Sequence, residues 1–431
     1  MTLHIPVDYL TASIADGVLR PGDPWYTEGA TTMTGEGSPD LVVRPRTTHE
    51  VATAVRFARG HRLPLTVRAG GHSIAGLSTV DRGLLLDLRR LDDVAVDPGT
   101  RRVRVGGGAT WGTVARALQP HGLGLTAGDT ASVGVGGLTL GGGIGWMVRR
   151  HGLAVDNLVG AQVVTAAGEV LETSADAHPD LFWALRGGGG GLGVVTRFDF
   201  RAEPVDDVLF GTVTFALEDP LTLLTAWRDH QRAAADRLTT VLNLLPPMEG
   251  RPAVAMLGLC LVGEREGAGL DPLLALGTVL RSDVAVRPYA DVLAEGHHAP
   301  GGRPTMRNTF LPELDDAALA HVARLTEGGA TVVSLRALGG ALARVPADAT
   351  AFAHRSAETL VTAISLAGDT VGSACAWADL AARGTGSYVN FLSVAGEHAD
   401  AVAYPARTRQ RLEQVRERYA AAGLSRAGVL P

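Results

Sequence analysis

Short apolar runs separated by turn residues dominate the first third of the chain. Residues 41–45 (LVVRP), 63–71 (LPLTVRAGG), 84–88 (LLLDL) and 101–108 (RRVRVGGG) each predict a short strand. A helix is predicted to begin at Thr48 as its cap. Its apolar stripe recurs at helical spacing and consists of Val51, Ala54, Val55, Phe57 and Ala58. Strands this short and this close together predict an α+β fold rather than a regular βαβ array.

The pattern from residue 206 onward predicts a sheet covered on one side by helices. Strands are expected over 208–217, 239–248 and 252–263, with helices over 219–238 and 269–282. The last segment contains the sequence TGSYVNFLS and a predicted helix over 402–423. We interpret the strands and helices between residues 206 and 380 as an α/β substrate domain, in which helices cover an antiparallel sheet.

Glycine marks the domain boundary, because the 55 glycines are unevenly distributed. They cluster at 70–71, 106–108, 134–145 and 187–193, and are sparser between about 215 and 380. We therefore expect a glycine-rich domain over 1–205, a substrate domain over 206–380, and a segment over 381–431 that returns to the first domain.

Composition and charge exclude several classes of function. A net charge of −6 argues against a nucleic-acid-binding protein. No apolar run is long enough to span a membrane, and the N-terminus lacks a signal-peptide pattern, so a cytoplasmic protein is expected. The two cysteines are far apart, and no metal site is predicted. All 39 basic residues are arginine, which excludes a P-loop, a pyridoxal-phosphate Schiff base and a lysine base.

Several glycine clusters within one domain favour a cofactor with a diphosphate, because glycine lets backbone N–H groups approach an anion closely. A literal GxGxxG occurs at Gly188, Gly190 and Gly193. It follows a predicted helix and precedes a predicted strand, the reverse of the order in a Rossmann nucleotide-binding unit. We therefore reject a nicotinamide-binding interpretation.

Three longer segments resemble the FAD domain shared by berberine bridge enzyme, 6-hydroxynicotine oxidases and vanillyl-alcohol oxidase. They are LVVRPRTTHEVATAVRFARGHRLPLTVRAGGHSIAGLST, GDTASVGVGGLTLGGGIGWMVRRHGLAVDNLVGAQVVTAAGEV and PDLFWALRGGGGGLGVVTRFDF. SLRALGGALARVPADATAFAHR and SYVNFL are similar to later segments of the same family. The resemblance implies a two-part FAD-binding domain of the p-cresol methylhydroxylase type. It also implies an FAD-dependent oxidase that takes hydride from an alcohol, amine or C–H of a small, specialised-metabolite substrate, with O2 as acceptor.

The resemblance also implies the residues of the site. His72 matches the histidine that carries FAD covalently, and Thr130 stands where some relatives have a second, cysteine anchor, so a single attachment is expected. Tyr388 and Asn390 match the catalytic Y-x-N motif at the flavin edge. The remaining matches to cofactor-binding positions are Arg68, Ala69, Gly70, Gly71, Ser73, Leu77, Gly134, Gly136, Gly137, Gly141, Gly142, Gly143, Asp156, Asn157, Val194 and Val195.

Three departures from the family pattern leave an alternative function open. Gly191-Leu192 replaces a usual Asn-Phe pair, Met306-Arg307 replaces an aromatic-Lys pair, and the tail AAAGLSRAGVLP lacks the usual flavin-contacting segment. The alternative is a protein with the flavin fold that acts as a non-redox catalyst or as a drug-binding resistance protein. The expected partners are a small-molecule substrate and O2, with no nucleic acid and no membrane, in a monomer or homodimer.

Overall fold

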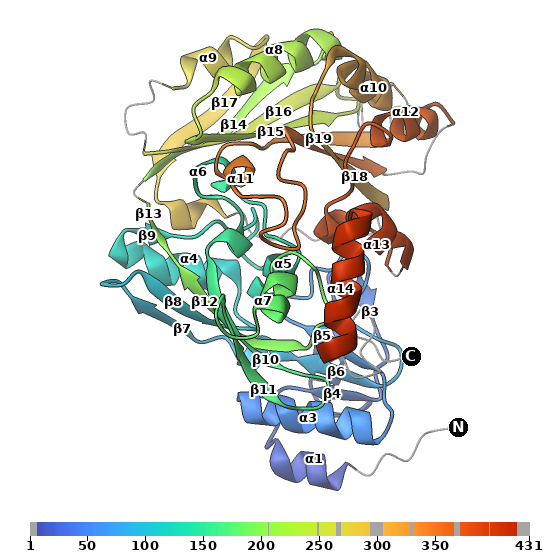
Figure 1. The fold of residues 1–431 in the computed structure, drawn as a ribbon. Coiled ribbons are helices and arrows are strands. Elements are labelled where there is room, and N and C mark those ends of the chain that lie inside the picture. Colours follow the sequence, from blue (N-terminus) through green and yellow to red (C-terminus); the bar gives the residue numbers. More distant parts are fainter. Residues whose placement is uncertain are drawn as a thin grey trace.

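The computed structural model describes residues 7–205, 207–247, 250–263, 269–293, 305–327, 331–365, 371–395 and 397–419. Figure 1 shows a large antiparallel sheet with helices on its outer face, above a lower part that holds two smaller sheets. The tail at 420–431, which differs from the family pattern, lies outside the described residues. This mixture of helices and mainly antiparallel sheets is the α+β fold predicted from the sequence.

The first sheet is built from the short apolar runs of the N-terminal region. Its order is β1-β4-β6-β5, and β6 pairs in parallel with both β4 and β5. Helix α3 (Thr48–Gly60) packs on it through the predicted apolar stripe, all five residues of which are buried. The cap is Thr47 rather than Thr48, because the Thr47 hydroxyl accepts the Glu50 N–H. The strands are β1 (Val18–Leu19), β4 (Leu41–Val43), β5 (Leu65–Arg68) and β6 (Leu84–Asp87).

The second sheet is antiparallel, with the order β11-β10-β12-β8-β7. Helix α4 (Trp111–Leu118) packs beside it and continues as a 3₁₀ turn to Gly122, whose φ of 62° ends the segment. The strands are β7 (Val94–Asp97), β8 (Arg102–Gly106), β10 (Leu158–Val164), β11 (Val170–Thr173) and β12 (Val194–Arg201). The smaller elements are α1 (Asp8–Ser13), α2 (Tyr26–Ala30), β2 (Thr31–Thr32), β3 (Gly35–Glu36), β9 (Leu123–Gly124), α5 (Val135–Leu140), α6 (Val148–His151), α7 (Pro179–Leu185) and β13 (Glu203–Pro204).

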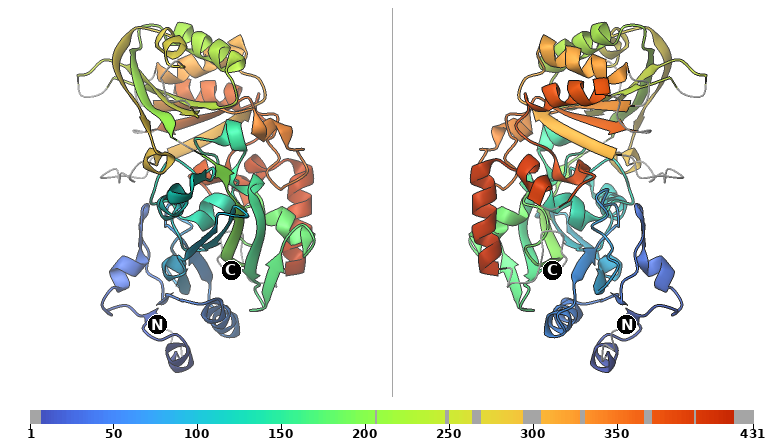
Figure 2. Two further views of the ribbon diagram at one scale, coloured as in Figure 1. Left: turned by 90° about the vertical axis from the view of Figure 1, so that its left-hand side faces the viewer. Right: turned by 90° about the vertical axis from the view of Figure 1, so that its right-hand side faces the viewer.

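The third sheet has seven antiparallel strands in the order β17-β14-β16-β15-β19-β20-β18. Helices α8, α10 and α12 cover its outer face, and its inner face turns toward the glycine-rich part (Figures 1 and 2). Leucine, valine and alanine side chains from alternate strand positions pack beneath these helices, as period-two burial requires. The elements are β14 (Val208–Ala216), α8 (Pro220–Ala233), β15 (Leu238–Leu245), β16 (Val254–Val262), β17 (Val279–Arg287), β18 (Thr305–Leu311), α10 (Asp316–Thr326), β19 (Thr331–Ala337), α11 (Ala341–Arg344), β20 (Thr359–Ser365) and α12 (Val371–Ala381).

Two predicted helices were wrong in part. The helix expected over 269–282 is only the short α9 (Asp271–Leu274), after which the chain continues as strand β17. The helix expected over 402–423 begins in α13 (Glu397–Ala403), breaks at Pro405, and resumes as α14 (Ala406–Tyr419). Proline cannot continue a helix because it lacks the N–H and clashes with the preceding turn. Helix α14 then packs against α7 (Figure 1).

Among the described residues, no helix is both long and apolar enough to cross a membrane. Both cysteines are free; Cys260 is buried within β16, and Cys375 is exposed on α12.

Candidate functional site

Two glycine loops meet where the first two sheets adjoin. A Cβ built on Gly70 would lie 2.3 Å from the backbone nitrogen of Gly134, and one on Gly134 would lie 2.2 Å from the nitrogen of Gly70. A Cβ on Gly136 would lie 3.0 Å from the carbonyl oxygen of Gly107 and 3.5 Å from the Cβ of Ala69. Only glycine permits backbones to approach this closely. The contact places the loop 69–73 against the start of α5.

This contact makes a prediction about stability. Gly134→Ala should lower the free energy of unfolding by about 1–3 kcal/mol, because the added methyl group forces the two loops apart. Gly60→Ala is the matched control, since nothing lies within 4 Å of a Cβ at the end of α3. Denaturant unfolding of both variants checks this. Equal stability of the two variants would mean that the loop contact is not tight in solution.

A buried arginine lies behind the loop 69–73. Arg68 ends strand β5 and is only 6% exposed, and its Nη1 donates to the carbonyl oxygens of Gly29 and Glu28 at 2.6 and 3.3 Å. Its Nε is buried without a hydrogen-bond partner among the described residues. Burial lowers the pKa of this guanidinium, but arginine remains charged. The loop therefore has a positive charge and an unused donor beneath it.

The side chain of His72 is half-buried and faces the segment 128–132. Its Nε2 lies 3.1 Å from the hydroxyl oxygen of Ser132. Thr130 lies two residues before Ser132, and its hydroxyl donates to Asp129 at 3.2 Å. On the other side of His72, the Ser73 hydroxyl accepts the N–H of Leu77 at 3.1 Å, which closes the turn. The structure therefore brings His72 close to the segment that contains Thr130.

Tyr388 and Asn390 lie against the second glycine loop, at 141–143. The Tyr388 hydroxyl oxygen accepts the N–H groups of Gly143 and Ile144 at 3.1 and 3.3 Å. Asn390 Nδ2 donates to the same oxygen at 2.9 Å and to the carbonyl oxygen of Leu138 at 3.0 Å. A Cβ on Gly141 would lie 2.2 Å from Asn390 Oδ1, so this position also requires glycine.

The environment of the Tyr388 hydroxyl acts on its pKa in two directions. The side chain is 2% exposed, and burial raises the pKa above its usual value near 10. The three donors and the charge of Arg336 oppose that shift, since they stabilise the phenolate. The balance is a raised pKa, so Tyr388 is a neutral phenol near pH 7 whose oxygen is surrounded by donors.

Asn308 on strand β18 holds Tyr388 in place and was not predicted. Its Oδ1 accepts the Tyr388 N–H at 2.5 Å, and its Nδ2 donates to the carbonyl oxygens of Tyr388 and Phe391 at 3.1 and 3.0 Å. These contacts join residues about eighty positions apart. A single Asn within an apolar strand is the only signal the sequence gives for it.

Several predicted cofactor residues have structural partners inside the protein. Asp156 forms a bidentate ion pair with Arg355, with both Nη–Oδ distances 2.7 Å. Asn157 donates to the carbonyl oxygens of His151 and Leu153. Val194 and Val195 are buried in strand β12, and Gly107 packs against the carbonyl of Val195. Contact of these four residues with a cofactor remains a prediction.

The cluster at 187–193 packs against other protein segments. A Cβ on Gly188 would lie 2.5 Å from Leu412 of α14, and one on Gly187 would lie 2.5 Å from the nitrogen of Phe352. At these two positions glycine allows close packing, which is a different use from the diphosphate binding that we inferred for the clusters as a group.

The side chain of His354 links the segment before Tyr388 to helix α13. Its Nε2 lies 2.7 Å from the carbonyl oxygen of Ala403, its Nδ1 lies 3.0 Å from Thr385 Oγ1, and its ring stacks on Phe310. Burial lowers the pKa of this imidazole to about 4. The neutral ring therefore ties α13 to the start of the Tyr388 segment.

The low pKa of His354 predicts a pH-dependent stability. Between pH 6.5 and 4 the imidazole is protonated in the unfolded chain but stays neutral in the native protein. The free energy of unfolding therefore falls as the pH is lowered through this window. The expected loss is about 3 kcal/mol from this residue. Denaturant unfolding at several pH values should show a shallower loss for His354→Gln than for the wild type. Parallel curves for the two proteins would contradict the assignment.

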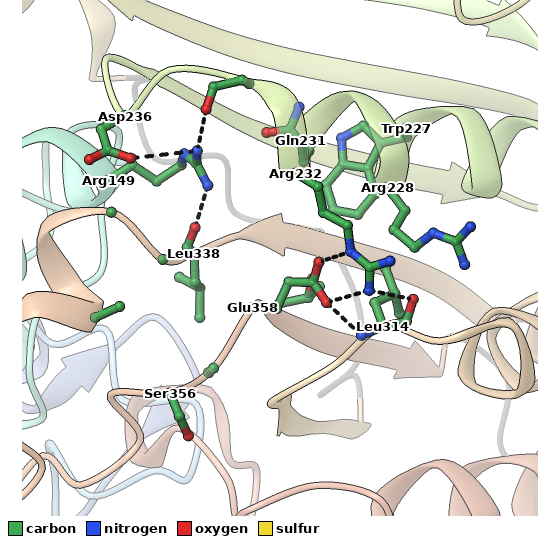
Figure 3. Close-up of a pocket in the computed structure, with 16 residues that line it drawn as sticks. Arg149, Trp227, Arg228, Gln231, Arg232, Asp236, Leu314, Leu338, Ser356 and Glu358 are labelled. Carbon is green, nitrogen blue, oxygen red and sulfur yellow. Dashed lines mark hydrogen bonds and ion pairs between the residues drawn. The ribbon is translucent and has the colours of Figure 1, made fainter.

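A cavity of about 360 Å³ lies elsewhere, between α6, α8 and the loops at 338–343 and 356–359. Figure 3 shows Arg149 and the Arg232–Glu358 ion pair around it. None of the predicted site residues lines this cavity. It is therefore separate from the site at the two glycine loops.

Comparison with known proteins identifies the family. An FAD binding domain matches residues 39–174. An FAD-linked oxidoreductase of Bacillus subtilis is 32% identical over 79% of this chain and 78% of its own length. (R)-6-hydroxynicotine oxidase of Paenarthrobacter nicotinovorans is 33% identical over 69% of this chain and 67% of its own.

A solved structure shows the same fold. Glucooligosaccharide oxidase from Acremonium strictum, with a 6-S-cysteinyl, 8α-N1-histidyl FAD, covers 95% of each chain with a TM-score of 0.81 and 23% identity. The sequence resemblance is thus confirmed both by relatives and by the fold. The chain is an enzyme of the family of FAD-linked oxidoreductases that these two relatives, the Bacillus subtilis protein and (R)-6-hydroxynicotine oxidase, represent.

Proposed function

We propose that this enzyme is an oxidase that removes hydride from an alcohol, amine or activated C–H of a small molecule and passes the electrons to O2. One observation carries the proposal: the hydroxyl of Tyr388 lies beside the glycine loop 141–143, surrounded by three hydrogen-bond donors. Such a group can hold or release a proton at one fixed position.

The residues present fit an FAD. The loop 69–73 and the start of α5 meet backbone to backbone and form a cradle in which the Cβ position of Gly137 is open, and Arg68 supplies a buried charge with an unpartnered Nε. We propose that this cradle holds the diphosphate, with glycines 134, 136 and 137 contributing backbone contacts. Gly141, Gly142 and Gly143 would lie along the flavin, next to Tyr388.

We further propose a single covalent attachment at His72. Attachment through Nδ1 is compatible with the bond that Nε2 makes to Ser132. The glucooligosaccharide oxidase has both a cysteinyl and a histidyl link. Thr130 has no thiol, so a second thioether cannot form from that residue.

When bound, FAD supplies the acceptor for the hydride and returns the electrons to the final acceptor. The protein supplies the proton chemistry at Tyr388 Oη. Its three donors stabilise the phenolate and fix its position, and Asn308 fixes the backbone that carries it. The rings of Phe310, Phe352 and Phe391 pack around the Tyr388 ring, which is 2% exposed.

The division of the chain supports a site between two domains. We propose that 1–205 and 381–431 form the FAD-binding domain and that 206–380 forms the substrate domain. The seven-stranded sheet consists only of strands between Val208 and Ser365, and α14 packs on α7 of the first part. Binding sites are common at such domain interfaces.

Oxygen reactivity can be tested without knowing the substrate. The purified flavoprotein is reduced by light under anaerobic conditions, and air is then admitted while flavin absorbance is followed. An oxidase should regain its oxidised spectrum rapidly and release hydrogen peroxide. Flavin that stays reduced in air would contradict the choice of O2, and protein purified without flavin would contradict the cofactor assignment.

A further inference from the structure

Two buried donors without partners lie close together where the sheet of the substrate domain meets the glycine-rich part. Arg336 is 6% exposed and Trp146 is 8% exposed. Arg336 Nη1 and Trp146 Nε1 are both buried with no hydrogen-bond partner among the described residues. The guanidinium carbon of Arg336 lies 5.7 Å from the centre of the Trp146 ring. The two unused N–H groups therefore belong to one small region.

This region belongs to the inner face of the seven-stranded sheet. Leu335 and Ala337 pack under the helices on the outer face, so Arg336 between them lies on the opposite face. In the register of β15 and β19, Val241 lies opposite Arg336, and Asn243 lies opposite Ser334. Asn243 and Ser334 are half-buried and polar. The inner face near Arg336 thus carries several polar side chains, unlike the apolar outer face of the same sheet.

Arg336 also connects this face to the proposed flavin site. Its Nη2 donates to Asp129 Oδ2 at 2.8 Å, and Asp129 belongs to the segment whose Ser132 contacts His72. The positive charge of Arg336 is close enough to Tyr388 to lower the pKa of its hydroxyl. Arg336 therefore lies near both the residue proposed to carry FAD and the residue proposed to handle the proton.

The chemistry of the two unused groups defines what they can bind. A guanidinium and an indole N–H are donors only, so neither can satisfy the other. Leaving such groups buried without an acceptor is costly, whereas an anionic oxygen would pair with both. A protonated amine would have to lie beside a buried positive charge in a region of low dielectric, which is unfavourable.

We propose that Arg336 and Trp146 form a subsite for an anionic oxygen of the substrate, a carboxylate or phenolate, within the proposed oxidase site. The inference rests on the proposed function and narrows its substrate class to molecules that carry an acidic oxygen, rather than cationic amines. Arg336 supplies the charge, and Trp146 supplies the second donor from the loop that follows glycines 141–143.

Benzoate and benzylamine, which match in ring size and differ in charge, test the proposal on the flavin-loaded protein. Each is titrated while the change in flavin absorbance is followed. Benzoate should bind the wild type at least about tenfold more tightly than benzylamine, and Arg336→Met and Trp146→Phe should each weaken benzoate by about tenfold or more. Arg281→Met, at an exposed position on β17 of the same sheet, is the matched control and should leave both affinities unchanged.

The outcomes separate this inference from the proposed function. A yellow, oxygen-reactive protein that binds benzoate no better than benzylamine, or not at all, would overturn the subsite alone. The subsite would also be overturned if Arg336→Met and Trp146→Phe each bound benzoate with an affinity within about twofold of that of the control variant. Water would then satisfy the two donors. If Arg336→Met fails to fold, Trp146→Phe decides the question in the same way. A protein without flavin would instead contradict the proposed function.

Discussion

His72→Ala is expected to abolish covalent attachment of FAD while leaving the fold intact. The His72 side chain is half-buried in a loop and contacts Ser132, so its removal opens a small space but exposes no core. Acid precipitation should give a yellow wild-type pellet, and a denaturing gel should show a fluorescent band. The variant should give a colourless pellet with the flavin in the supernatant.

The control for this variant is His121→Ala, since His121 is exposed at the end of the 3₁₀ turn after α4. It should keep the covalent flavin. A wild-type pellet that is itself colourless would show that FAD is bound without a covalent link. A His72→Ala pellet that stays yellow would move the attachment to another residue.

Tyr388→Phe is expected to slow flavin reduction by roughly 10²–10⁴-fold with FAD attachment unchanged. The reason is that the Tyr388 hydroxyl is the atom toward which Gly143, Ile144 and Asn390 direct their N–H groups. Single-turnover anaerobic reduction by a substrate measures the effect. Because burial raises the pKa of Tyr388, the wild-type rate should increase about tenfold per pH unit above neutrality if the phenolate is the base, and the variant should lose this dependence.

A loss of structure must be distinguished from a loss of proton transfer. The substitution removes the acceptor of the Gly143 and Ile144 N–H groups and one of the two acceptors of Asn390 Nδ2, and should also cost about 1–3 kcal/mol of stability. Tyr26→Phe is a suitable control, because the buried Tyr26 hydroxyl donates to the carbonyl of Pro39 away from the site. It should lose stability without slowing reduction. A Tyr388→Phe enzyme that reduces its flavin at the wild-type rate, with the same pH profile, would make Tyr388 a packing residue.

The parts of the fold that the sequence predicted are those where burial repeats with a regular period. The stripe of α3 and the alternating burial of strand β14 are visible in the chain, and the apolar runs of β15 and β16 are long enough to mark buried strands. Strand β17 was assigned in part to a helix because it is an exposed edge strand. Its residues are mostly solvent-accessible, and no alternation marks them.

The site was predictable where glycine had to be present and less so where distant side chains meet. Gly70 and Gly134 are required by a close backbone approach, and such clusters are conspicuous in a sequence. The Asp129–Arg336 pair joins residues 207 positions apart, and no local pattern indicates it. The same holds for Asn308, whose partner Tyr388 is brought to it only by the complete fold.

The edge strand β18 pairs with β20 on one side, and the segment leading to Tyr388 lies along it. The backbone N–H of Phe310 donates to Gly386 at 2.8 Å, that of Thr385 donates to Phe310 at 2.9 Å, and Ser393 contacts Met306. Exposed strand edges promote association between chains. The segment that carries the proposed proton acceptor therefore also protects the sheet from aggregation, so partial opening of this segment should cause loss of turnover and self-association at the same temperature.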